Sequence, residues 1–568
     1  MNNYCGINGG LHNNTINFDG SNTIFLLGQN NVGKSSFLKA YKDFYNNEKP
    51  GIDKFYNKEI SNKIEIQIEI EFEAGEKIQL GEKLNNAELK YFYGANNNRL
   101  TIKKVWSTND QLSNDFTLKN DKSNFDDIGY AGVGEHNIFK ALFPMPIFIA
   151  AMPSESDVDS IINEILSEKV KQLLKDTELK EYKDAQETIR KLQQKTYQSN
   201  EIEKYKTTVN EYFSKMFSDI KISISERNPD LVLKGIDKKF QIDFEHISPE
   251  KQKVASIPTG FENIGHGAIR TALFTLLLMK DVASGKTETI KKKEYLVLFE
   301  EPELFLHPKL AKTLRELIYE VSQDATKFQV ICASHSPQMI DITKPKTSLV
   351  RMVKNDNYST NMYQINDNDL SDQNPAGELK IKEEVLEALR FNPFICESFY
   401  ADEVILVEGD TEAVILRGYL QEVHFKKDIF IVNCGSVNNF PFFQKIFSKF
   451  SIKYHLIFDT DERPYTKKDD YYIFNSGIQK SISDKYTEDR KRPMKPGLMC
   501  IHIPTFEPAH EKLVNVSTQY TYSREANKFG KPYAANLYWK EKLQPALRSG
   551  NSLDEVPIIN YIKNIINS

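Results

Sequence analysis

An eight-residue segment near the start of the chain restricts the possible fold more than any other feature. It reads Gly28-Gln-Asn-Asn-Val-Gly-Lys-Ser35, and it follows the apolar run from Thr23 to Leu27. The run is short and ends at glycine, which predicts a buried strand, and the amphipathic residues from Ser35 to Tyr41 predict a helix. A strand, a glycine-bearing loop and a helix in this order indicate an α/β domain.

The same segment is suited to binding phosphate. Its glycines let backbone N–H groups turn toward an anion, and the helix that follows offers its positive N-terminal end. Lys34 would pair with the β- and γ-phosphates of a nucleotide, and Ser35 would ligate Mg²⁺. A glycine turn in a generic strand–helix unit is the alternative, but the strand before and the helix after favour a nucleotide site. The loop residues predicted to bind the cofactor are Gly28, Asn30, Asn31, Gly33, Lys34, Ser35 and Ser36.

Two later strand ends supply acidic and imidazole groups. The apolar run that starts at Tyr295 ends in Glu300 and Glu301. One of these acids can hold Mg²⁺ through water, and the other can orient a water that attacks the γ-phosphate; we assign these roles to Glu300 and Glu301 in that order. A second run, starting at Val330, ends in His335, which is suited to sensing a γ-phosphate. A lone histidine at the end of a strand is more often structural. His335 therefore supports a nucleotide site only in combination with the acids that precede it in the sequence.

A third segment, Gly265-His-Gly-Ala-Ile-Arg270, opens a further helix. Its glycines, Gly265 and Gly267, would give a second N-terminus able to bind an anion. By itself this signal is weak. In combination with the phosphate loop and the strand-end residues, it predicts an ATP site.

Two apolar runs late in the chain also end in acids. One leads from Val404 to Glu408, with Glu412 four residues further on, and the other leads from His455 to Asp459 and Asp461. Ligand sites in parallel sheets gather at the carboxyl ends of strands, so we expect these acids to meet. Such carboxylates repel one another unless a cation lies among them. Helix N-caps would explain single acids but not an acidic pair at both strand ends.

Composition limits the remaining possibilities. The 568 residues are enough for several domains, and a hydrophobic content of 40% is ordinary for a soluble globular protein. A net charge of -5 gives no general attraction to nucleic acid, so DNA binding would need local basic patches such as the run from Lys485 to Lys495. The five cysteines are scattered without a C-x-x-C pair, which favours reduced thiols. No signal peptide or membrane-spanning run is evident, so we expect a cytoplasmic protein.

Changes of pattern along the chain suggest where domains begin and end. From Ser154 the sequence is polar and lacks glycine, with apolar residues at helical spacing, which predicts long helices inserted into the first domain. A second α/β unit begins near Glu403. We expect residues 1–153 and 219–375 to form an ATPase domain, residues 154–218 a helical dimerisation insert, residues 376–400 a linker helix, and residues 401–568 the second unit.

The first domain resembles the ABC-type ATPases of the SMC, Rad50 and RecF group. In these proteins a Walker A loop, a signature loop, a Walker B strand and a switch histidine follow one another as they do here. The resemblance assigns residues 265–270 to the signature loop that meets the nucleotide of a partner head, which implies dimerisation. Two positions depart from the pattern: Glu300 stands where most ABC proteins have Asp, and Ile269 stands where Gln is common. The Glu300 departure suits the branch with Glu-Glu-Pro-Glu, whereas Ile269 favours nucleotide sensing over rapid hydrolysis.

The second unit resembles a Toprim domain, whose marks are Glu408-Gly409 and Asp459-Thr-Asp461. With Glu-Glu-Pro-Glu at residues 300–303 and Leu306-His-Pro308, the chain resembles the OLD (overcoming lysogenisation defect) family, to which the nuclease subunit of the Gabija antiphage system belongs. This implies an ABC-type ATPase head with an inserted helical arm, followed by a Toprim α/β domain. It also implies a DNA endonuclease of antiphage defence that uses ATP and Mg²⁺ or Mn²⁺. A dimer or tetramer and a possible helicase partner subunit are implied as well.

Phosphodiester cleavage needs an activated water and charge neutralisation, which two cations roughly 4 Å apart provide. Glu408, Asp459 and Asp461 would hold one ion, and Glu412, one helical turn after Glu408, can reach the second. The resemblance implies a further acid, Glu507 with Glu511 as runner-up, and a late lysine, Lys531, to offset charge on the phosphate. A solvated loop lysine is the alternative for Lys531. The predicted catalytic residues are Glu408, Asp459, Asp461, Lys531, Glu301 and His335, and the predicted metal ligands are Glu408, Glu412, Asp459, Asp461, Glu507 and Ser35.

A different function would use the same domains. The chain would then be an SMC- or RecF-like DNA-repair ATPase whose Toprim module is a docking platform. Such a protein needs no metal-dependent cleavage, and a docking module has no physical reason to retain costly clustered carboxylates. A topoisomerase or primase would share the acids, but a topoisomerase also needs a positioned tyrosine in a separate domain.

Overall fold

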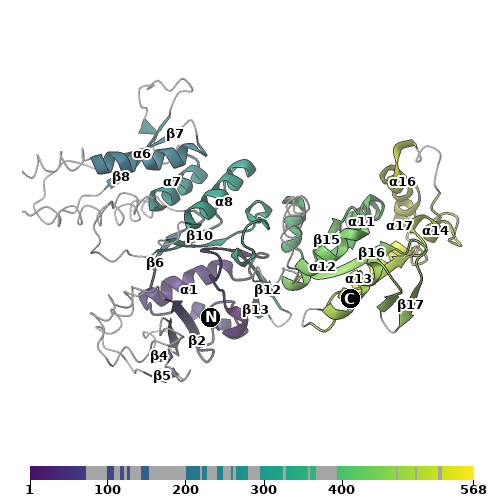
Figure 1. Cartoon of the computed structure of the whole chain (residues 1–568), viewed down its shortest axis with the longest axis horizontal. Coiled ribbons are helices and arrows are strands. Elements are labelled where there is room, and N and C mark those ends of the chain that lie inside the picture. The colour runs from purple at the N-terminus through teal and green to yellow at the C-terminus, as the bar shows by residue number, and fades with distance from the viewer. Residues whose placement is uncertain are drawn as a thin grey trace, which may run out of the picture. The chain divides into compact units, whose positions relative to one another are not determined.

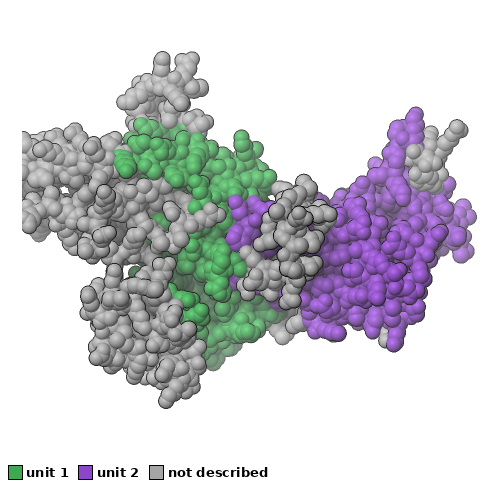
Figure 2. Space-filling model, in the orientation of Figure 1, with its two compact units in different colours: residues 1–339, 347–362 green, residues 340–346, 363–568 purple. Residues whose placement is uncertain are grey.

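The computed structural model describes residues 1–71, 99–107, 115–119, 125–127, 143–152, 200–217, 220–226, 240–246, 258–259, 264–278, 295–323, 328–355, 358–365, 393–468, 471–492, 495–521 and 528–568. They form two compact units (Figure 2). Unit 1 comprises Met1–Met339 and Thr347–Met362, and unit 2 comprises Ile340–Lys346 and Tyr363–Ser568. Most of the expected helical insert and of the linker helix lies outside the described residues.

Unit 1 is built on a six-stranded sheet in the order β13-β12-β1-β11-β10-β6 (Figure 1). Strand β1 pairs in parallel with both β11 and β12, and β10 pairs in parallel with β11 and β6. All five residues of β1 are buried, as expected for a parallel strand that is covered on both faces. The bounds are β1 (Thr23–Leu27), β6 (Met145–Ile149), β10 (Tyr295–Glu300), β11 (Phe328–Ala333), β12 (Leu349–Lys354) and β13 (Thr360–Gln364).

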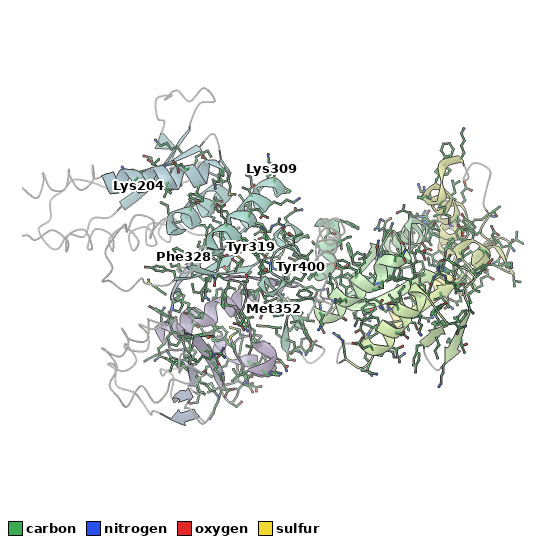
Figure 3. All side chains as sticks on the ribbon, viewed as in Figure 1. Lys204, Lys309, Tyr319, Phe328, Met352 and Tyr400 are labelled. Atoms are coloured by element: carbon green, nitrogen blue, oxygen red, sulfur yellow. The ribbon has the colours of Figure 1, made fainter. Side chains whose placement is uncertain are left out.

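Helices cover both faces of this sheet (Figure 1). Ile24 and Leu26 of β1 share a hydrophobic core with α1, whereas the Phe25 ring lies 5.5 Å from that of Tyr319 on α8. Tyr319 is labelled in Figure 3. Because alternate residues of a strand point to opposite faces, α1 and α8 lie on opposite sides. Phe299 of β10 contacts α7 through Phe274, on the α8 side. The bounds are α1 (Lys34–Asn46), α6 (Asn200–Ser214), α7 (His266–Leu278) and α8 (Pro308–Gln323).

Smaller sheets flank the central one in unit 1. Strand β2 pairs antiparallel with β3, and the residues of β2 are alternately buried and accessible at its start, as in a strand with one exposed face. The bounds of these strands are β2 (Ile64–Glu71), β3 (Arg99–Trp106), β4 (Asp115–Lys119), β5 (Phe125–Asp127), β7 (Ile220–Glu226), β8 (Phe240–His246) and β9 (Pro258–Thr259). The 3-10 turns are η1 (His12–Asn14), η2 (Ile52–Lys54), η3 (Tyr56–Lys58), η6 (Pro337–Met339) and η7 (Lys346–Ser348).

Unit 2 contains a four-stranded, wholly parallel sheet in the order β15-β14-β16-β19. Ile405 and Ile457 pack with α11 and α18 on one face, and Phe458 meets Phe440 of α12 on the other. The strands are β14 (Glu403–Val407), β15 (Ile429–Asn433), β16 (Lys453–Asp459), β17 (Tyr465–Lys468), β18 (Tyr471–Phe474) and β19 (Met499–His502). The helices are α10 (Pro393–Cys396), η9 (Glu397–Phe399), α11 (Asp410–Glu422), η10 (Val437–Asn439), α12 (Phe440–Lys449), α13 (Ile478–Asp489), α14 (Phe506–Glu511), α16 (Lys531–Tyr538), the π-helical η11 (Trp539–Leu543), α17 (Gln544–Arg548) and α18 (Pro557–Asn567).

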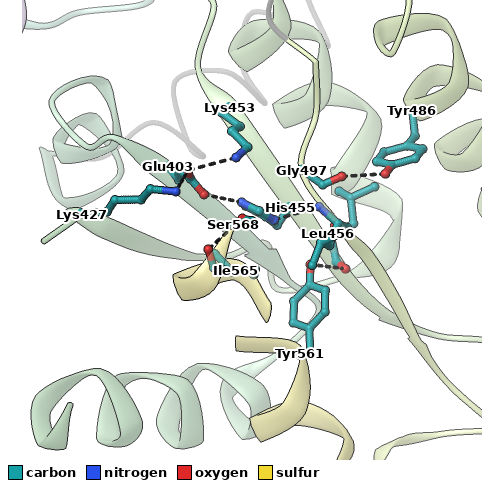
Figure 4. A network of polar contacts seen from close by, with 11 residues as sticks. Glu403, Lys427, Lys453, His455, Leu456, Tyr486, Gly497, Tyr561, Ile565 and Ser568 are labelled. Carbon is teal, nitrogen blue, oxygen red and sulfur yellow. Dashed lines mark hydrogen bonds and ion pairs between the residues drawn. The ribbon is translucent and has the colours of Figure 1, made fainter. Parts of the chain in front are cut away.

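A charged cluster closes the amino-terminal edge of this sheet (Figure 4). Glu403 accepts hydrogen bonds from Lys427 at 2.9 Å and Lys453 at 3.0 Å. His455, fully buried, accepts from the backbone N–H of Leu498 at Nδ1, so Nε2 carries the proton and donates to Glu403 at 2.8 Å. Burial opposes ionisation, but these three donors lower the pKa of Glu403 to about 2. The cluster therefore holds an ionised carboxylate inside the unit.

Among the residues that the structure describes, no helix combines the length and the apolar character that crossing a bilayer requires.

Candidate active sites

Two glycines shape the phosphate loop of unit 1. Gly28 follows β1 with φ of 148°, and a Cβ at this position would collide with the carbonyl oxygen of Met352. Gly33 precedes α1 with φ of 100°, and a Cβ there would lie 2.9 Å from Cγ1 of Ile7. Both positions therefore require glycine, for backbone angle and for space. Between them Asn30 and Asn31 are exposed.

Lys34 is buried at the start of α1, with its ammonium inside the loop. It donates to the carbonyl oxygens of Gly28 at 2.6 Å and Gln29 at 2.8 Å, and it lies 3.3 Å from Nδ1 of His335. Burial lowers the pKa of Lys34 to about 8. Burial and the neighbouring ammonium lower the pKa of His335 to about 4, so this imidazole is neutral near pH 7. Ser35 is exposed and Ser36 is half-buried in the first turn of α1.

Glu301, the first residue after β10, lies beside His335. The backbone N–H of Glu301 donates to the carbonyl of Ala333 at 2.7 Å, and its carboxylate lies 3.7 Å from Nε2 of His335. Glu301 has a positive φ of 43°, which is uncommon for glutamate and marks a constrained turn. Glu300, half-buried, ends the strand itself. His335, Glu300 and Glu301 thus lie at one edge of the sheet.

Glu303 is a residue that the sequence analysis quoted only as part of a motif. Its Oε1 accepts from the backbone N–H of His335 at 3.0 Å and from the hydroxyl of Ser334 at 2.8 Å. Burial raises the pKa of Glu303. This carboxyl group therefore connects the Walker B turn to the loop that carries the histidine.

The segment that resembles a signature loop begins α7. Gly265 and His266 are exposed, so this N-terminus is open to solvent. Gly267 is buried, and a Cβ there would lie 2.6 Å from Cδ2 of Leu306. Arg270 is also buried and donates to the backbone carbonyls of Glu300 and Leu304. The exposed residues remain available to a ligand, whereas Gly267 and Arg270 fasten the segment to the Walker B turn.

In unit 2, Glu408 and Asp459 meet at the carboxyl edge of the parallel sheet. Glu408 follows β14 and Asp459 ends the adjacent β16, and the backbone N–H of Asp459 donates to Oε2 of Glu408 at 3.2 Å. Burial raises the pKa of Glu408 to about 7, and the charges of Asp459, Asp461 and Glu412 act in the same direction. The carboxylates from two separate strands therefore share one local environment.

A third strand brings a histidine that the sequence analysis missed. His502 ends β19, in register with Asp459 of β16. Its Nδ1 lies 3.1 Å from Oδ1 of Asp459 and 3.9 Å from Oε1 of Glu412. Donor atoms of Glu412, Asp459 and His502 all lie within 4.8 Å of one another, which is compatible with a shared metal ion. Glu412 is buried in the first turn of α11, and burial raises its pKa.

Asp461 borders the same site. Its side chain is exposed, its φ is 49°, and its backbone N–H donates to the carbonyl of Pro504 at 2.9 Å. The negative charge of Asp461 contributes to the raised pKa of Glu408.

Glu507 and Lys531 form a pair beside the acids. Nζ of Lys531 lies 3.0 Å from Oε1 of Glu507. The bond to Glu507 raises the pKa of Lys531, and the charges of Asp459 and Glu412 add to the effect, so the lysine lies within electrostatic range of the cluster. Glu507 is half-buried in the first turn of α14, whereas Glu511, the runner-up, is exposed at the end of that helix.

The basic run of the sequence is partly neutralised within the unit. Lys485 lies 2.5 Å and Arg492 lies 3.1 Å from Oδ1 of Asp489, which is buried. These two cations stabilise the end of α13, so a contact with a DNA backbone would depend on the other basic residues of the run.

The fold and the two sites define a P-loop ATPase domain followed by a Toprim-type domain. A family model described as an AAA ATPase domain matches residues 9–340, and one described as "Overcoming lysogenization defect protein-like, TOPRIM domain" matches residues 399–461. The chain therefore belongs to the AAA ATPase domain family and carries an OLD-like Toprim domain, which confirms the family resemblance read from the sequence. A domain of the first kind implies nucleotide binding, and a Toprim domain implies use of a divalent metal.

Two curated relatives match parts of this chain. The Old nuclease of Escherichia phage P2 is 24% identical over 301 residues, which cover 50% of this chain and 47% of that protein. Endonuclease GajA of Bacillus cereus (strain VD045) is 24% identical over 442 residues, covering 72% of this chain and 65% of that protein. The chain thus spans between about half and just under two thirds of the length of these relatives.

Among solved structures, a Pyrococcus furiosus Smc head domain with an extended coiled coil, bound to the C-terminal domain of ScpA, has a TM-score of 0.38. It is 14% identical and covers 68% of this chain and 98% of that chain. A score of this size supports no conclusion about function.

Proposed function

We propose that this chain is a nucleotide-regulated, metal-dependent DNA endonuclease of the OLD family that acts in antiphage defence. The observation that carries the proposal is the meeting of Glu408, Glu412 and Asp459 at the carboxyl edge of the unit 2 sheet, with the Lys531–Glu507 pair beside them. The two relatives are named as a nuclease and an endonuclease, which supports the same activity.

The residues at this edge fit divalent metal ions. Glu412 is only 4% exposed, and the charge of Asp459 further disfavours its ionisation. Like charges gathered in a partly buried site are costly unless a cation lies among them. Carboxylate oxygens are ligands for Mg²⁺ and Mn²⁺. When bound, such ions supply an activated water and neutralise charge on the phosphate.

Each residue then has a distinct part in cleavage. Glu408, Asp459 and Asp461 would hold one ion, and Glu412 and Glu507 would hold the second, to which Asp459 would also contribute because its donor atoms lie close to those of Glu412. Lys531, oriented by its 3.0 Å contact with Glu507, offsets the negative charge that develops on the scissile phosphate.

Nucleotide at unit 1 controls this activity. Lys34, which now donates to backbone carbonyls, would hold the β- and γ-phosphates of a bound nucleotide, and Ser35 would ligate the accompanying Mg²⁺. His335, already 3.3 Å from Lys34, lies where it can report on a γ-phosphate, and Glu301 orients the attacking water. The exposed Gly265 end of α7 meets the nucleotide of a second head, so the active form is a dimer or a larger symmetric assembly. Ile269 favours binding and sensing over rapid turnover.

Plasmid cleavage by the purified chain tests the proposal. Supercoiled DNA is incubated with Mg²⁺ or Mn²⁺, with and without ATP or a non-hydrolysable analogue. Glu408→Gln and Asp459→Asn are expected to reduce cutting at least about 100-fold, because each removes a metal ligand. Glu511→Gln, an exposed acid on α14, is the matched control and keeps wild-type cutting.

Cutting at the wild-type rate by both acid variants would overturn the metal assignment. DNA binding with nucleotide-dependent changes but no cleavage by the wild-type chain would instead favour a repair ATPase that uses its Toprim module for docking.

A further inference from the structure

We propose that His502 is a metal ligand, binding through Nδ1 an ion that it shares with Glu412 and Asp459, and that this nitrogen makes the site favour Mn²⁺ over Mg²⁺. The proposal rests on the proposed function, because it names the donor set of that same site. It adds a neutral nitrogen donor to the carboxylates that the Toprim resemblance assigns.

The backbone places His502 at this point. Strand β19 lies next to β16, and His502 is the register partner of Asp459 at the ends of the two strands. Its side chain is only 1% exposed. Because parallel strands end at the same edge of a sheet, the imidazole and the carboxylate are held together by main-chain hydrogen bonds.

The separations of the donor atoms suit a single ion. Nδ1 lies 3.1 Å from Oδ1 of Asp459 and 3.9 Å from Oε1 of Glu412. Ligands about 2.0–2.2 Å from a metal are about 3 Å apart when they are adjacent and about 4.3 Å apart when they are opposite. Both measured separations fall in this interval.

A structural role for His502 is the alternative, with Nδ1–H donating to Asp459 and orienting it. A second histidine in the same cluster shows what a structural role looks like. His510 donates to the carbonyl of Phe506 at 2.8 Å and accepts from the backbone N–H of Ile558 at 3.4 Å, so both of its nitrogens are used. Burial lowers the pKa of His510 to about 3, so this imidazole is neutral.

His502 differs from this pattern. Its Nε2 is buried and has no hydrogen-bond partner within the described part of the chain. Nδ1 is close to two carboxylates, and one N–H can satisfy only one of them, leaving their mutual repulsion in place. An ion among the three donors removes that repulsion and uses the nitrogen lone pair.

The ring of His502 is also held in a fixed plane. The rings of Phe506 and His510 stand nearly perpendicular to it, each with a centroid separation of 5.2 Å. A buried side chain braced by two rings loses little conformational freedom when it binds a ligand, which favours coordination.

A nitrogen donor changes which metal binds best. Mg²⁺ prefers oxygen ligands in near-ideal octahedral geometry, whereas imidazole suits first-row transition metals. His502→Asn separates the two roles, because the Asn amide N–H can still donate to Asp459 but offers no imidazole nitrogen. We expect this variant to bind Mn²⁺ at least about tenfold more weakly while its Mg²⁺ affinity changes by less than about threefold.

Pulsed electron paramagnetic resonance of the full chain with Mn²⁺, without nucleotide or DNA, tests the ligand directly. We expect ¹⁴N coupling from a bound imidazole in the wild type, its loss in His502→Asn, and its retention in His424→Asn, which changes an exposed histidine of the same unit. Asp459→Asn should weaken the bound signal, which identifies the site. Parallel titrations with Mn²⁺ and Mg²⁺ measure the affinities.

Bound Mn²⁺ without ¹⁴N coupling in the wild type would overturn the proposal, as would a ¹⁴N signal that survives in His502→Asn or a chain that binds no Mn²⁺. The wild-type spectrum decides the question even where the variant fails to fold. Coupling without any DNA cleavage would refute the endonuclease function and leave the ligand assignment standing, so the two failures are distinguishable.

Discussion

Nζ of Lys34 lies 3.3 Å from Nδ1 of His335, although 301 positions separate the two residues in the sequence. The adjacency arises because β1 and β11 are parallel neighbours, so the residues that follow them leave the sheet at the same edge. A phosphate group held by the lysine would therefore be next to the imidazole. This relationship gives the phosphate loop a physical connection to the loop after β11.

The effect of ATP on DNA cleavage should depend on the buried carboxyl group of Glu303, which accepts hydrogen bonds from the loop after β11. Glu303→Ala removes the acceptor of the His335 N–H and the Ser334 hydroxyl, and leaving buried donors unpaired costs about 1–3 kcal/mol. We expect the variant to bind ATP, as seen by a thermal shift, but to lose most of the effect of ATP on DNA cleavage.

Glu303→Gln is the matched control, because an amide oxygen accepts the same two hydrogen bonds. The raised pKa of Glu303 means that a neutral group already suits this position. A Gln variant that loses the ATP response as fully as Ala would show that charge, and not the hydrogen bonds, is required.

The phosphate-loop glycines predict a second set of effects. Gly33→Ala forces a positive φ on alanine and sets its Cβ 2.9 Å from Ile7, so we expect a loss of about 1–3 kcal/mol in the free energy of unfolding and a large loss of ATP binding. Gly265→Ala is the contrasting change, since no atom of the described residues lies within 4 Å of a Cβ there. Chemical denaturation should give wild-type stability for Gly265→Ala; equal destabilisation by both changes would contradict this explanation.

Sequence reasoning could anticipate the elements whose patterns are local. An apolar run identifies the buried strand Thr23–Leu27. Apolar runs also identify β14 and β16, and the acids Glu408 and Asp459 stand at the ends of these runs. Their convergence followed from the rule that parallel strands share a carboxyl edge.

The histidine His502 could not be found in this way. Strand β19 has only four residues, Met499–His502, too few to display a period, and its placement beside β16 is set by tertiary packing. The contacts of Glu303 were equally hard to predict, because a sequence motif identifies a residue but not the backbone N–H group that donates to its side chain. The signal that could have pointed to His502 is its position directly after the short apolar segment of residues 498–501, the first such segment after α13.

The ion cluster around Glu403 predicts how stability depends on pH. Its pKa of about 2 lies below the ordinary value of 4.5, so the ionised form is the one that the fold stabilises. The contribution is complete above about pH 4.5 and is lost as the pH falls toward 2. Glu403→Gln should lower the free energy of unfolding of the unit near pH 7 by about 2–3 kcal/mol, since it leaves His455 and two lysines without their carboxylate.

Urea denaturation at several pH values provides the measurement, and the difference between the variant and the wild type should shrink below pH 4.5. Glu422→Gln is the control, because the Glu422–Arg548 pair lies at the surface and should leave the denaturation curve almost unchanged. A difference that grows as the medium is acidified would contradict the assignment.

Lys531 gives the most direct separation of catalysis from folding. Its side chain is 66% exposed, so Lys531→Ala should leave the melting temperature unchanged, whereas the loss of a positive charge at the phosphate should slow DNA cleavage about 100-fold. Because Lys531 is a cation and is not itself proposed as a metal ligand, binding of Mn²⁺ should change much less than the rate. Lys528→Ala removes an exposed lysine three residues earlier and should cut DNA at the wild-type rate. If both lysine variants lost activity to the same extent, Lys531 would belong to a general DNA-binding surface and not to the reaction centre.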